Sequence, residues 1–209
     1  MDCYYEKVWK ERGLNSNMDP INILVGMNII ATFGANASSA KKGLRSSIGV
    51  SKEKPQTYLQ KLPIILSVLT LLGIIVGVFQ IGTINYSGNN EKLRLVGFIF
   101  YLVFSWFQIW AFKTLGENYS QDVLIFRSHQ LITKGPFKFL RHPQYLSQIL
   151  MDLGAGIATL SFIVIPLALI EIPLLILRAS LEEKLLEKNF KEAFMNYKKT
   201  TGFFIPFIG

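Results

Sequence analysis

The residues Arg141-His142-Pro143 have the types and the position expected of an anion-binding site. Pro143 opens a long apolar segment, and proline is favoured at the first position of a helix, where its missing N–H costs nothing. His142 is then expected at the N-cap, beside the free backbone N–H groups of a helix start. Such a site suits a carboxylate or a phosphate. The alternative is a basic cluster that contacts lipid phosphates at a membrane surface.

A second group of ionisable residues, Arg178, Glu182 and Glu183, lies where the same apolar segment ends. Arg178 and Glu182 are four residues apart, so they share one face of a helix. Apolar residues recur along this stretch at helical spacing, namely Leu181, Leu185, Phe190, Phe194 and Tyr197. This pattern by itself fits an interfacial amphipathic helix with ordinary ion pairs, and a reactive site is the alternative.

Two more acids, Asp152 and Glu171, fall inside apolar sequence. Ionisable groups within a bilayer are costly, so they indicate function unless they hydrogen-bond to a neighbouring helix. His129 has no residues of ligand type near it in the sequence, and Cys3 is the single cysteine. We therefore predict neither a metal site nor an internal disulfide.

Apolar segments must position all these groups. Four runs with few or no charges are candidates for membrane helices: 21–37, 62–84, 95–112 and 145–177. The last run is too long for one ordinary helix, and its Gly, Thr, Ser and Pro residues predict a helical hairpin that turns near residues 159–162. One long kinked helix is the alternative. The sequence thus predicts an all-α membrane protein with about five transmembrane helices.

The distribution of charge decides between a membrane protein and a nucleic-acid-binding protein. The 209 residues are 50% hydrophobic and 17% charged, with a net charge of +8. Of the 22 Lys and Arg residues, six lie in 38–61, five in 113–144 and six from 178 onward. Five spans would put these segments on one side, which the positive-inside rule makes cytoplasmic, with the N-terminus outside. The excess of positive charge is then explained by membrane topology, without binding to nucleic acid. The mixed charges of residues 1–20 do not indicate a signal peptide.

The two groups together resemble the membrane isoprenylcysteine carboxyl methyltransferase family and its prokaryotic relatives. Lys134-Gly135-Pro136-Phe137 followed by Arg141-His142-Pro143-Gln144-Tyr145 is similar to the family signature in order and spacing. Leu115-Gly116-Glu117-Asn118-Tyr119-Ser120 precedes it as in the family, and Arg178…Glu182-Glu183…Tyr197 follows. Phe137 stands where a Tyr is usual and Tyr119 where a Trp is usual. The resemblance covers about residues 113–206, and residues 1–60 add nothing to it.

The resemblance implies methyl transfer from S-adenosylmethionine to a lipophilic acceptor that enters from the bilayer. The first candidate acceptor is the carboxylate of an isoprenylcysteine-like or prenylated substrate. The apolar runs predict an N-terminal three-helix membrane region (1–112), and the resemblance implies a catalytic region (113–209) with a cytoplasmic cofactor-binding C-terminal part, without a Rossmann fold. The residues implied to bind the cofactor are Lys134, Gly135, Pro136, Phe137, Arg141, His142, Pro143, Tyr145 and Tyr197.

The resemblance also implies roles for single residues. His142, at its helix start, would hold the carboxylate of the cofactor. Arg178 would orient an acceptor carboxylate, because its planar fork binds one bidentately. Glu182 or Glu183 would fix Arg178 or, for an amine or thiol acceptor, take a proton.

Three alternatives remain open. A phospholipid or other small-lipid N-methyltransferase would share the cofactor segment and differ only in its acceptor. A sterol-reductase-like membrane enzyme has a similar C-terminal region and would use NADPH instead. A non-enzymatic membrane protein that keeps a relic of the signature is the third.

Overall fold

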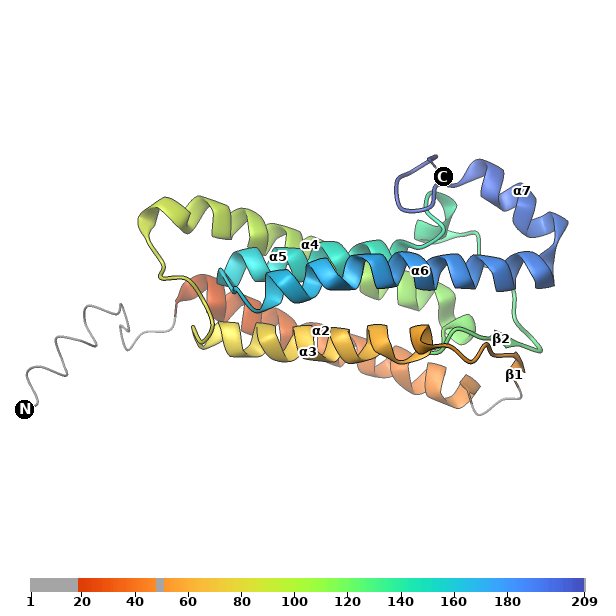
Figure 1. Ribbon diagram of the computed structural model, residues 1–209, viewed down its shortest axis with the longest axis horizontal. Coiled ribbons are helices and arrows are strands. Elements are labelled where there is room, and N and C mark those ends of the chain that lie inside the picture. Colours follow the sequence, from red (N-terminus) through yellow and green to blue (C-terminus); the bar gives the residue numbers. More distant parts are fainter. Residues whose placement is uncertain (1–18, 48–50, 209) are drawn as a thin grey trace, which may run out of the picture.

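Five long helices form an elongated bundle in the part of the chain that the computed structural model describes, residues 19–47 and 51–208 (Figure 1). They are α2 (Pro20–Ser47), α3 (Leu62–Val78), α4 (Glu91–Leu115), α5 (Pro143–Thr159) and α6 (Val164–Phe190). Helix α5 packs against α4 and α6, while α2 packs against α4 and α3 packs against α6. Their apolar core is made by Val25, Ile74, Val78, Tyr101, Ala155, Ala158 and Val164.

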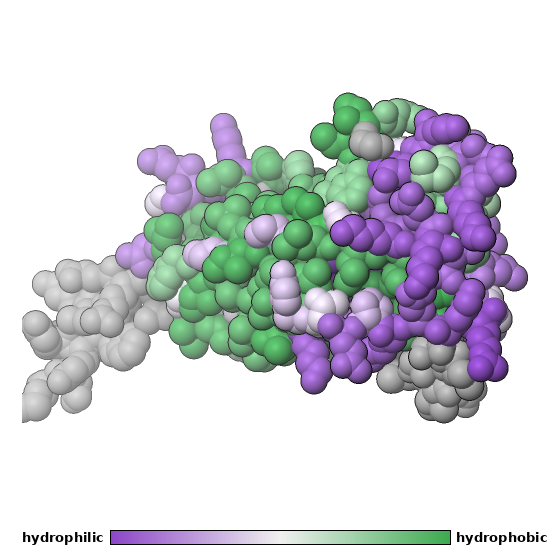
Figure 2. Space-filling model, turned by 45° about the vertical axis from the view of Figure 1, so that its right-hand side comes forward, coloured by the Kyte–Doolittle hydropathy of each residue, from purple (hydrophilic) through white to green (hydrophobic). Residues whose placement is uncertain are grey.

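The apolar surface of the bundle is that of a multi-pass membrane protein. Within the described residues, three helical stretches are long and apolar enough to cross a bilayer: Tyr58–Val78, Gly88–Asn118 and Val164–Phe190. The apolar part of α2, Pro20–Ala35, is shorter. Figure 2 shows hydrophobic side chains over the middle of one face and hydrophilic side chains gathered at one end. The prediction of five membrane spans stays a prediction.

The helical hairpin expected near residues 159–162 is present. Helix α5 ends at Thr159, and α6 begins at Val164. Leu160 turns the chain with a left-handed backbone, at a φ of 49°. The Ser161 hydroxyl then accepts the backbone N–H groups of Ile163 and Val164 at 3.3 and 3.2 Å, which satisfies the start of α6. The alternative of one long kinked helix is therefore wrong.

Two glycines let α4 and α5 approach until their backbones touch. A Cβ atom added to Gly154 would lie 2.6 Å from the backbone nitrogen of Tyr101, and one added to Gly97 would lie 2.7 Å from that of Ala158. Small residues at such a crossing are typical of membrane helices, whose association depends on close packing. The contact brings the polar side chains of α5 next to those of α4.

The segments predicted to lie on one side all lie at the same end of the bundle, which we call the polar end. There β1 (Ser51–Glu53) pairs antiparallel with β2 (Ile125–Phe126). The ammonium group of Lys188 in α6 lies 2.6 Å from a carboxylate oxygen of Glu53. The short helix α7 (Glu192–Thr200) covers the same end (Figure 1).

Two local predictions are wrong at this end. Helix α2 continues past residue 37 to Ser47, so part of the expected loop 38–61 is helical. Its Ala and Lys residues favour a helix, and no proline stops it. The apolar pattern from Leu181 to Tyr197 is not one helix, because the backbone of Lys191 has a φ of 47° and separates α6 from α7.

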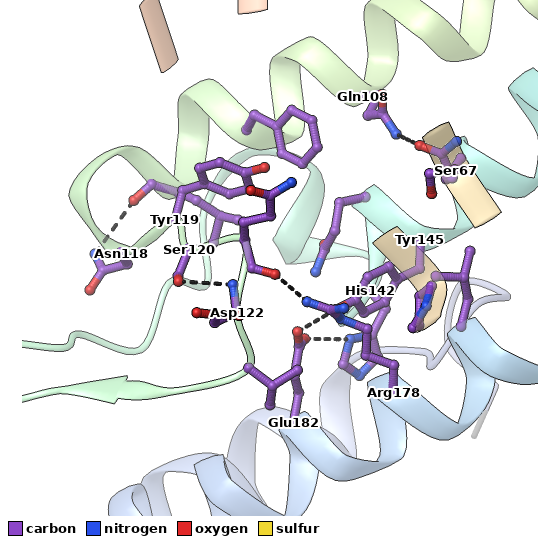
Figure 3. A pocket seen from close by; sticks show the side chains of 18 of the residues that line it. Ser67, Gln108, Asn118, Tyr119, Ser120, Asp122, His142, Tyr145, Arg178 and Glu182 are labelled. Atoms are coloured by element: carbon purple, nitrogen blue, oxygen red, sulfur yellow. Dashed lines mark hydrogen bonds and ion pairs between the residues drawn. The ribbon is translucent and has the colours of Figure 1, made fainter. Parts of the chain in front are cut away.

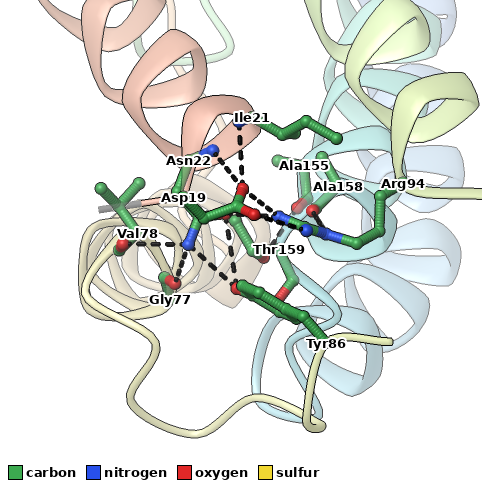
Figure 4. Close-up of polar contacts among 10 residues, drawn as sticks. All are labelled: Asp19, Ile21, Asn22, Gly77, Val78, Tyr86, Arg94, Ala155, Ala158 and Thr159. Carbon is green, nitrogen blue, oxygen red and sulfur yellow. Dashed lines mark hydrogen bonds and ion pairs between the residues drawn. The ribbon is translucent and has the colours of Figure 1, made fainter. Parts of the chain in front are cut away.

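The opposite end of the bundle is held by Arg94, which is buried (Figure 4). Its Nη1 and Nη2 atoms lie 2.9 and 2.5 Å from the two carboxylate oxygens of Asp19, and its Nε donates to the Ala158 carbonyl at 2.9 Å. The guanidinium carbon lies 3.7 Å from the centre of the Tyr86 ring. Asn22 accepts from Arg94 at 3.1 Å and donates to the Val78 carbonyl at 3.0 Å. These contacts connect α2, α3, α4 and α5.

Replacing Arg94 with leucine is expected to lower the free energy of unfolding by about 3–5 kcal/mol, because Asp19 and two further acceptors, on Asn22 and Ala158, lose a buried partner. Thermal unfolding in detergent measures the effect. The neighbouring Lys92 is exposed, and Lys92→Leu is the matched control with no expected loss. Equal stability of the two variants would contradict the inference that the buried contacts of Arg94 hold the helices together.

Candidate active site

A cavity of about 460 Å³ lies inside the polar end and extends between the helices toward the middle of the bundle. Its wall at the polar end includes the connector after α4, from Asn118 to Ile125, together with Arg178 and Glu182 of α6. Deeper in the bundle, its wall includes apolar side chains that are themselves exposed on the outer surface, Phe33 of α2 and Val68 and Leu71 of α3. The cavity therefore joins a charged site to the lipid-facing side of α2 and α3.

Tyr145 connects two of the charged residues that line this cavity, Arg178 and Glu182 (Figure 3). Its hydroxyl donates to the Glu182 carboxylate, and it accepts from the Nε of Arg178 at 3.0 Å. No direct Arg178–Glu182 ion pair occurs in the described part of the chain, although the four-residue spacing had suggested one. The tyrosine lies between the two groups because α5 packs against α6.

The other donors of Arg178 bind main-chain carbonyls from distant segments. Its Nη1 donates to the carbonyls of Leu59 and Gln60 at 3.1 and 3.4 Å. Its Nη2 donates to the Gln121 carbonyl. A guanidinium has five N–H groups, so these bonds and the one to Tyr145 use most of them. Arg178 thereby fixes the segment before α3 and the connector after α4 against α6.

Glu183 lies in a separate ionic cluster beside the cavity. Its carboxylate lies 2.6 Å from the Nε of Arg141, 2.9 Å from the Nζ of Lys198 and 3.3 Å from the Nε2 of His142. Arg141 also donates to the carbonyls of Lys198 and Thr201. The cluster thus joins the start of α5, the last turns of α6, and α7 with the residue that follows it. Glu183 is buried and does not line the cavity, whereas Glu182 does.

His142 occupies the expected N-cap position of α5, followed by Pro143 in the first turn. Its side chain makes no cap bond and instead faces Glu182 and Glu183, with 3.7 Å between its Nδ1 and a Glu182 oxygen. Burial opposes the charged imidazolium, but hydrogen bonds and charges of both glutamates outweigh it and raise the pKa of His142. Two carboxylates therefore lie where the cofactor carboxylate was expected, and His142 is paired with them.

The remaining predicted cofactor residues divide into lining and supporting groups. Phe137, Arg141, His142, Tyr145 and Tyr197 line the cavity. Tyr197 donates to the Phe137 carbonyl at 2.6 Å, and burial raises the pKa of Tyr197 to about 12. Lys134, Gly135, Pro136 and Pro143 are absent from the wall formed by the described residues.

Gly135 supports the cavity wall through its backbone. Its φ is +59°, and a Cβ atom there would lie 2.9 Å from the Thr114 hydroxyl. Only glycine adopts this conformation without strain. The turn that it makes begins the short 3₁₀ helix Gly135–Lys138, which carries Phe137 into the wall.

Several residues in and around the site were not predicted from the sequence. The Gln60 side chain forms two hydrogen bonds with the backbone of Val123. Its amide nitrogen donates to the Val123 carbonyl, and its amide oxygen accepts from the Val123 N–H, both at 2.8 Å. His129 lines the cavity between the rings of Phe126 and Phe190, and burial lowers its pKa, partly offset by the charge of Glu182. Gln144, inside the quoted signature, lines the cavity with a buried side-chain oxygen that has no partner in the described residues.

The fold and the site define a multi-pass helical membrane protein with a buried ionic site that opens toward its lipid-facing surface. Residues 95–188 match the model of the Isoprenylcysteine carboxyl methyltransferase (ICMT) family, so the resemblance expected from the sequence is confirmed over α4, α5 and most of α6.

A solved structure of the eukaryotic intramembrane Ras methyltransferase ICMT is similar in fold. The two share 19% sequence identity over 91% of this chain and 69% of that chain, with a TM-score of 0.61. No curated protein sequence matches the chain.

Proposed function

We propose that this protein is an integral membrane methyltransferase that moves a methyl group from S-adenosylmethionine to a lipophilic acceptor, in the first place the carboxylate of an isoprenylcysteine-like substrate. The observation that carries the proposal is the single cavity that runs from Tyr145, Arg178 and Glu182 to the exposed apolar side chains of α2 and α3. A hydrocarbon chain can enter from the bilayer side while its polar end reaches the ionic site. The family match over residues 95–188 supports the same reaction class.

The residues present fit S-adenosylmethionine. Buried polar atoms that have no hydrogen-bond partner in the described chain include Nδ1 of His129 and Oε1 of Gln144, and both residues line the cavity. Unused hydrogen-bonding capacity of this kind suits the amino, hydroxyl and ring-nitrogen groups of the cofactor. Phe137, Tyr145 and Tyr197 supply aromatic walls. When bound, the cofactor supplies an activated methyl group on a sulfonium, and the protein contributes position and the exclusion of water.

The charges assign a part to each ionic residue in this proposal. Glu182 carries negative charge at the cavity wall, which favours a sulfonium or ammonium over a carboxylate beside it. Arg178 keeps its guanidinium at the wall while its bonds to the Leu59, Gln60 and Gln121 carbonyls hold it still. Its remaining N–H attracts the acceptor carboxylate. Lys134, Gly135, Pro136 and Pro143 shape the site from outside the cavity, whereas Arg141 lines it and is held in place by Glu183.

The charge distribution supports an orientation with the polar end, and so the site, in the cytoplasm. Seventeen of the 22 Lys and Arg residues lie in the three segments that meet at that end. Positively charged segments stay preferentially on the cytoplasmic side.

Calorimetry and methyl-transfer assays on the purified protein in detergent test the proposal. We expect binding of S-adenosylmethionine but not of NADPH, and transfer of labelled methyl to S-farnesylcysteine as an alkali-labile ester. Binding of NADPH alone would favour the reductase. Binding of neither would leave a protein without this enzymatic function.

The same assay separates the two methyl-acceptor classes. A carboxylate acceptor needs no general base, whereas an amine must lose a proton, and Glu182 is the carboxylate at the cavity wall that Tyr145 links to Arg178. We expect Glu182→Gln to keep part of the carboxylate methylation. Alkali-stable methylation of a lipid amine that is abolished in Glu182→Gln would favour the phospholipid N-methyltransferase instead.

A further inference from the structure

The inner end of the cavity, at the level of the bundle core, has a row of polar side chains from three helices. The Gln108 amide of α4 donates to Gln148 of α5 at 2.6 Å, and the Gln148 amide donates to Asp152 at 2.6 Å. Ser67 of α3 lies beside them, and Figure 3 shows it near Gln108 and apart from the Arg178 and Glu182 side chains. All four of these residues line the cavity. The end expected to hold a hydrocarbon chain is therefore polar.

An acid pair lies behind this row. Asp152 is in contact with Glu171 of α6, whose carboxylate accepts from the Ser67 hydroxyl at 2.5 Å. The two acids are 2% and 0% exposed, and neither has a cationic partner in the described residues. One Glu171 oxygen, Oε2, has no hydrogen-bond partner there either. Carboxyl oxygens accept hydrogen bonds, and a buried one without a partner costs free energy.

The distance to the reacting end follows from the helix that carries both sites. Tyr145 and Asp152 are both in α5, seven residues apart. At 1.5 Å per residue, Asp152, the inner member of the row on α5, lies about 10 Å along the helix from the tyrosine that joins Arg178 to Glu182, and Gln148 lies about 4.5 Å from it. A plain hydrocarbon chain at this depth would cover Gln108, Gln148 and Asp152 without hydrogen-bonding to them, and covering polar groups in that way costs free energy.

We propose that the polar row Ser67, Gln108, Gln148 and Asp152 binds a hydrogen-bond-donating group, a hydroxyl or an amine, carried on the apolar chain of the acceptor about 10 Å from the methyl-accepting atom. This inference rests on the proposed function and narrows its substrate class. The acceptor is a lipid-like carboxylate with a polar group within its chain, rather than a plain prenyl chain. Sites built to hydrogen-bond a hydroxyl discriminate strongly against analogues that lack it.

Two matched acceptors test the proposal: a cysteine S-alkyl carboxylate with a plain chain, and the same compound with one hydroxyl about 10 Å from the carboxylate. For the wild-type protein we expect kcat/KM to be at least about tenfold higher for the hydroxylated compound. Asp152→Leu should remove this preference while S-adenosylmethionine still binds. Asp152→Asn, which keeps the shape and a polar group, should keep part of the preference and serves if the leucine variant does not fold. Glu117→Gln, at an exposed acid, is the control for loss of a carboxylate and should keep the full preference.

Binding of the corresponding carboxamides, which cannot be methylated, is measured in parallel by calorimetry. The expected preference in binding does not depend on turnover, so this measurement separates the two proposals. Failure to bind S-adenosylmethionine or to methylate either acceptor would refute the methyltransferase. Equal binding of both carboxamides, or the same ratio in wild type and Asp152→Leu, would overturn the polar subsite and leave the acid pair as a contact between helices. An acceptor with an amine in place of the hydroxyl identifies which donor is preferred.

Discussion

Glu183→Gln is expected to lower the free energy of unfolding by about 3–5 kcal/mol, whereas Glu182→Gln is expected to lower it by about 1 kcal/mol or less. The reason is the difference in surroundings. Glu183 is the anion for Arg141, Lys198 and His142, and Arg141 is itself buried. Removing the anion leaves the cation buried and uncompensated. Glu182 is partly exposed at the cavity wall and loses chiefly the bond from Tyr145.

Unfolding of the two variants is followed in detergent by circular dichroism, together with methyl transfer. Glu187, exposed on the same helix, provides the control variant Glu187→Gln, for which neither property should change. We expect Glu182→Gln to remain folded and to keep only part of the carboxylate-methylating activity. The assignment fails if the two neighbouring variants lose the same stability, because then burial and ion pairing do not distinguish these glutamates.

Arg178→Lys is expected to reduce kcat/KM for methyl transfer about 100-fold or more. The guanidinium binds Tyr145 and three main-chain carbonyls, of Leu59, Gln60 and Gln121, from segments far apart in the sequence. A lysine has one nitrogen and cannot reach all of them. Losing two charge-assisted bonds costs about 1.5–3 kcal/mol each, and about 3 kcal/mol on the barrier corresponds to more than a hundredfold in rate.

The matched control for this prediction is Arg127→Lys, since Arg127 is exposed and the same chemical change should leave the rate unaltered. Separate titrations of S-adenosylmethionine and acceptor locate the loss. Because Arg178 orients the acceptor in the proposed function, the acceptor KM should rise more than the cofactor dissociation constant. If kcat/KM of the Arg178→Lys variant is within threefold of the wild-type value, the hydrogen bonds of the guanidinium are not needed for methyl transfer.

Much of the fold follows from local sequence patterns. The apolar runs 62–84, 95–112 and 145–177 mark the positions of α3, α4 and the α5–α6 hairpin, although α4 and α6 extend beyond their runs, because a helix that crosses a bilayer must be apolar over the length of the crossing. Pro143 and His142 mark the start of α5 as expected. The basic segments also meet at one end, since consecutive antiparallel helices return the chain to the same side.

The candidate site was predicted less completely, because its contacts join segments that are distant in the sequence. The pattern at 178–183 left open which glutamate acts with Arg178, and Tyr145 from the neighbouring helix links Glu182 to it. Residues 1–60 added nothing to the resemblance, yet the Leu59 and Gln60 carbonyls bind Arg178. A backbone carbonyl is present at every position, so its use as a partner has no signature in residue types. The division at residues 112 and 113 stays a prediction, and the predictions for Cys3 and the N-terminal segment lie outside the described residues.

The sequence by itself determined that this is a helical membrane protein with its basic residues at one end and an ICMT-like signature between α4 and α6. Hydropathy, charge and helix-start residues are local properties, and each can be interpreted along the chain without knowing its neighbours in space. The tertiary structure alone decided that Glu183 stabilises while Glu182 faces the cavity, and that Asp152 and Glu171 meet across the hairpin. Which side chains meet depends on the rotation and crossing of packed helices, and here the close approach of α4 and α5 at Gly97 and Gly154 decides part of it.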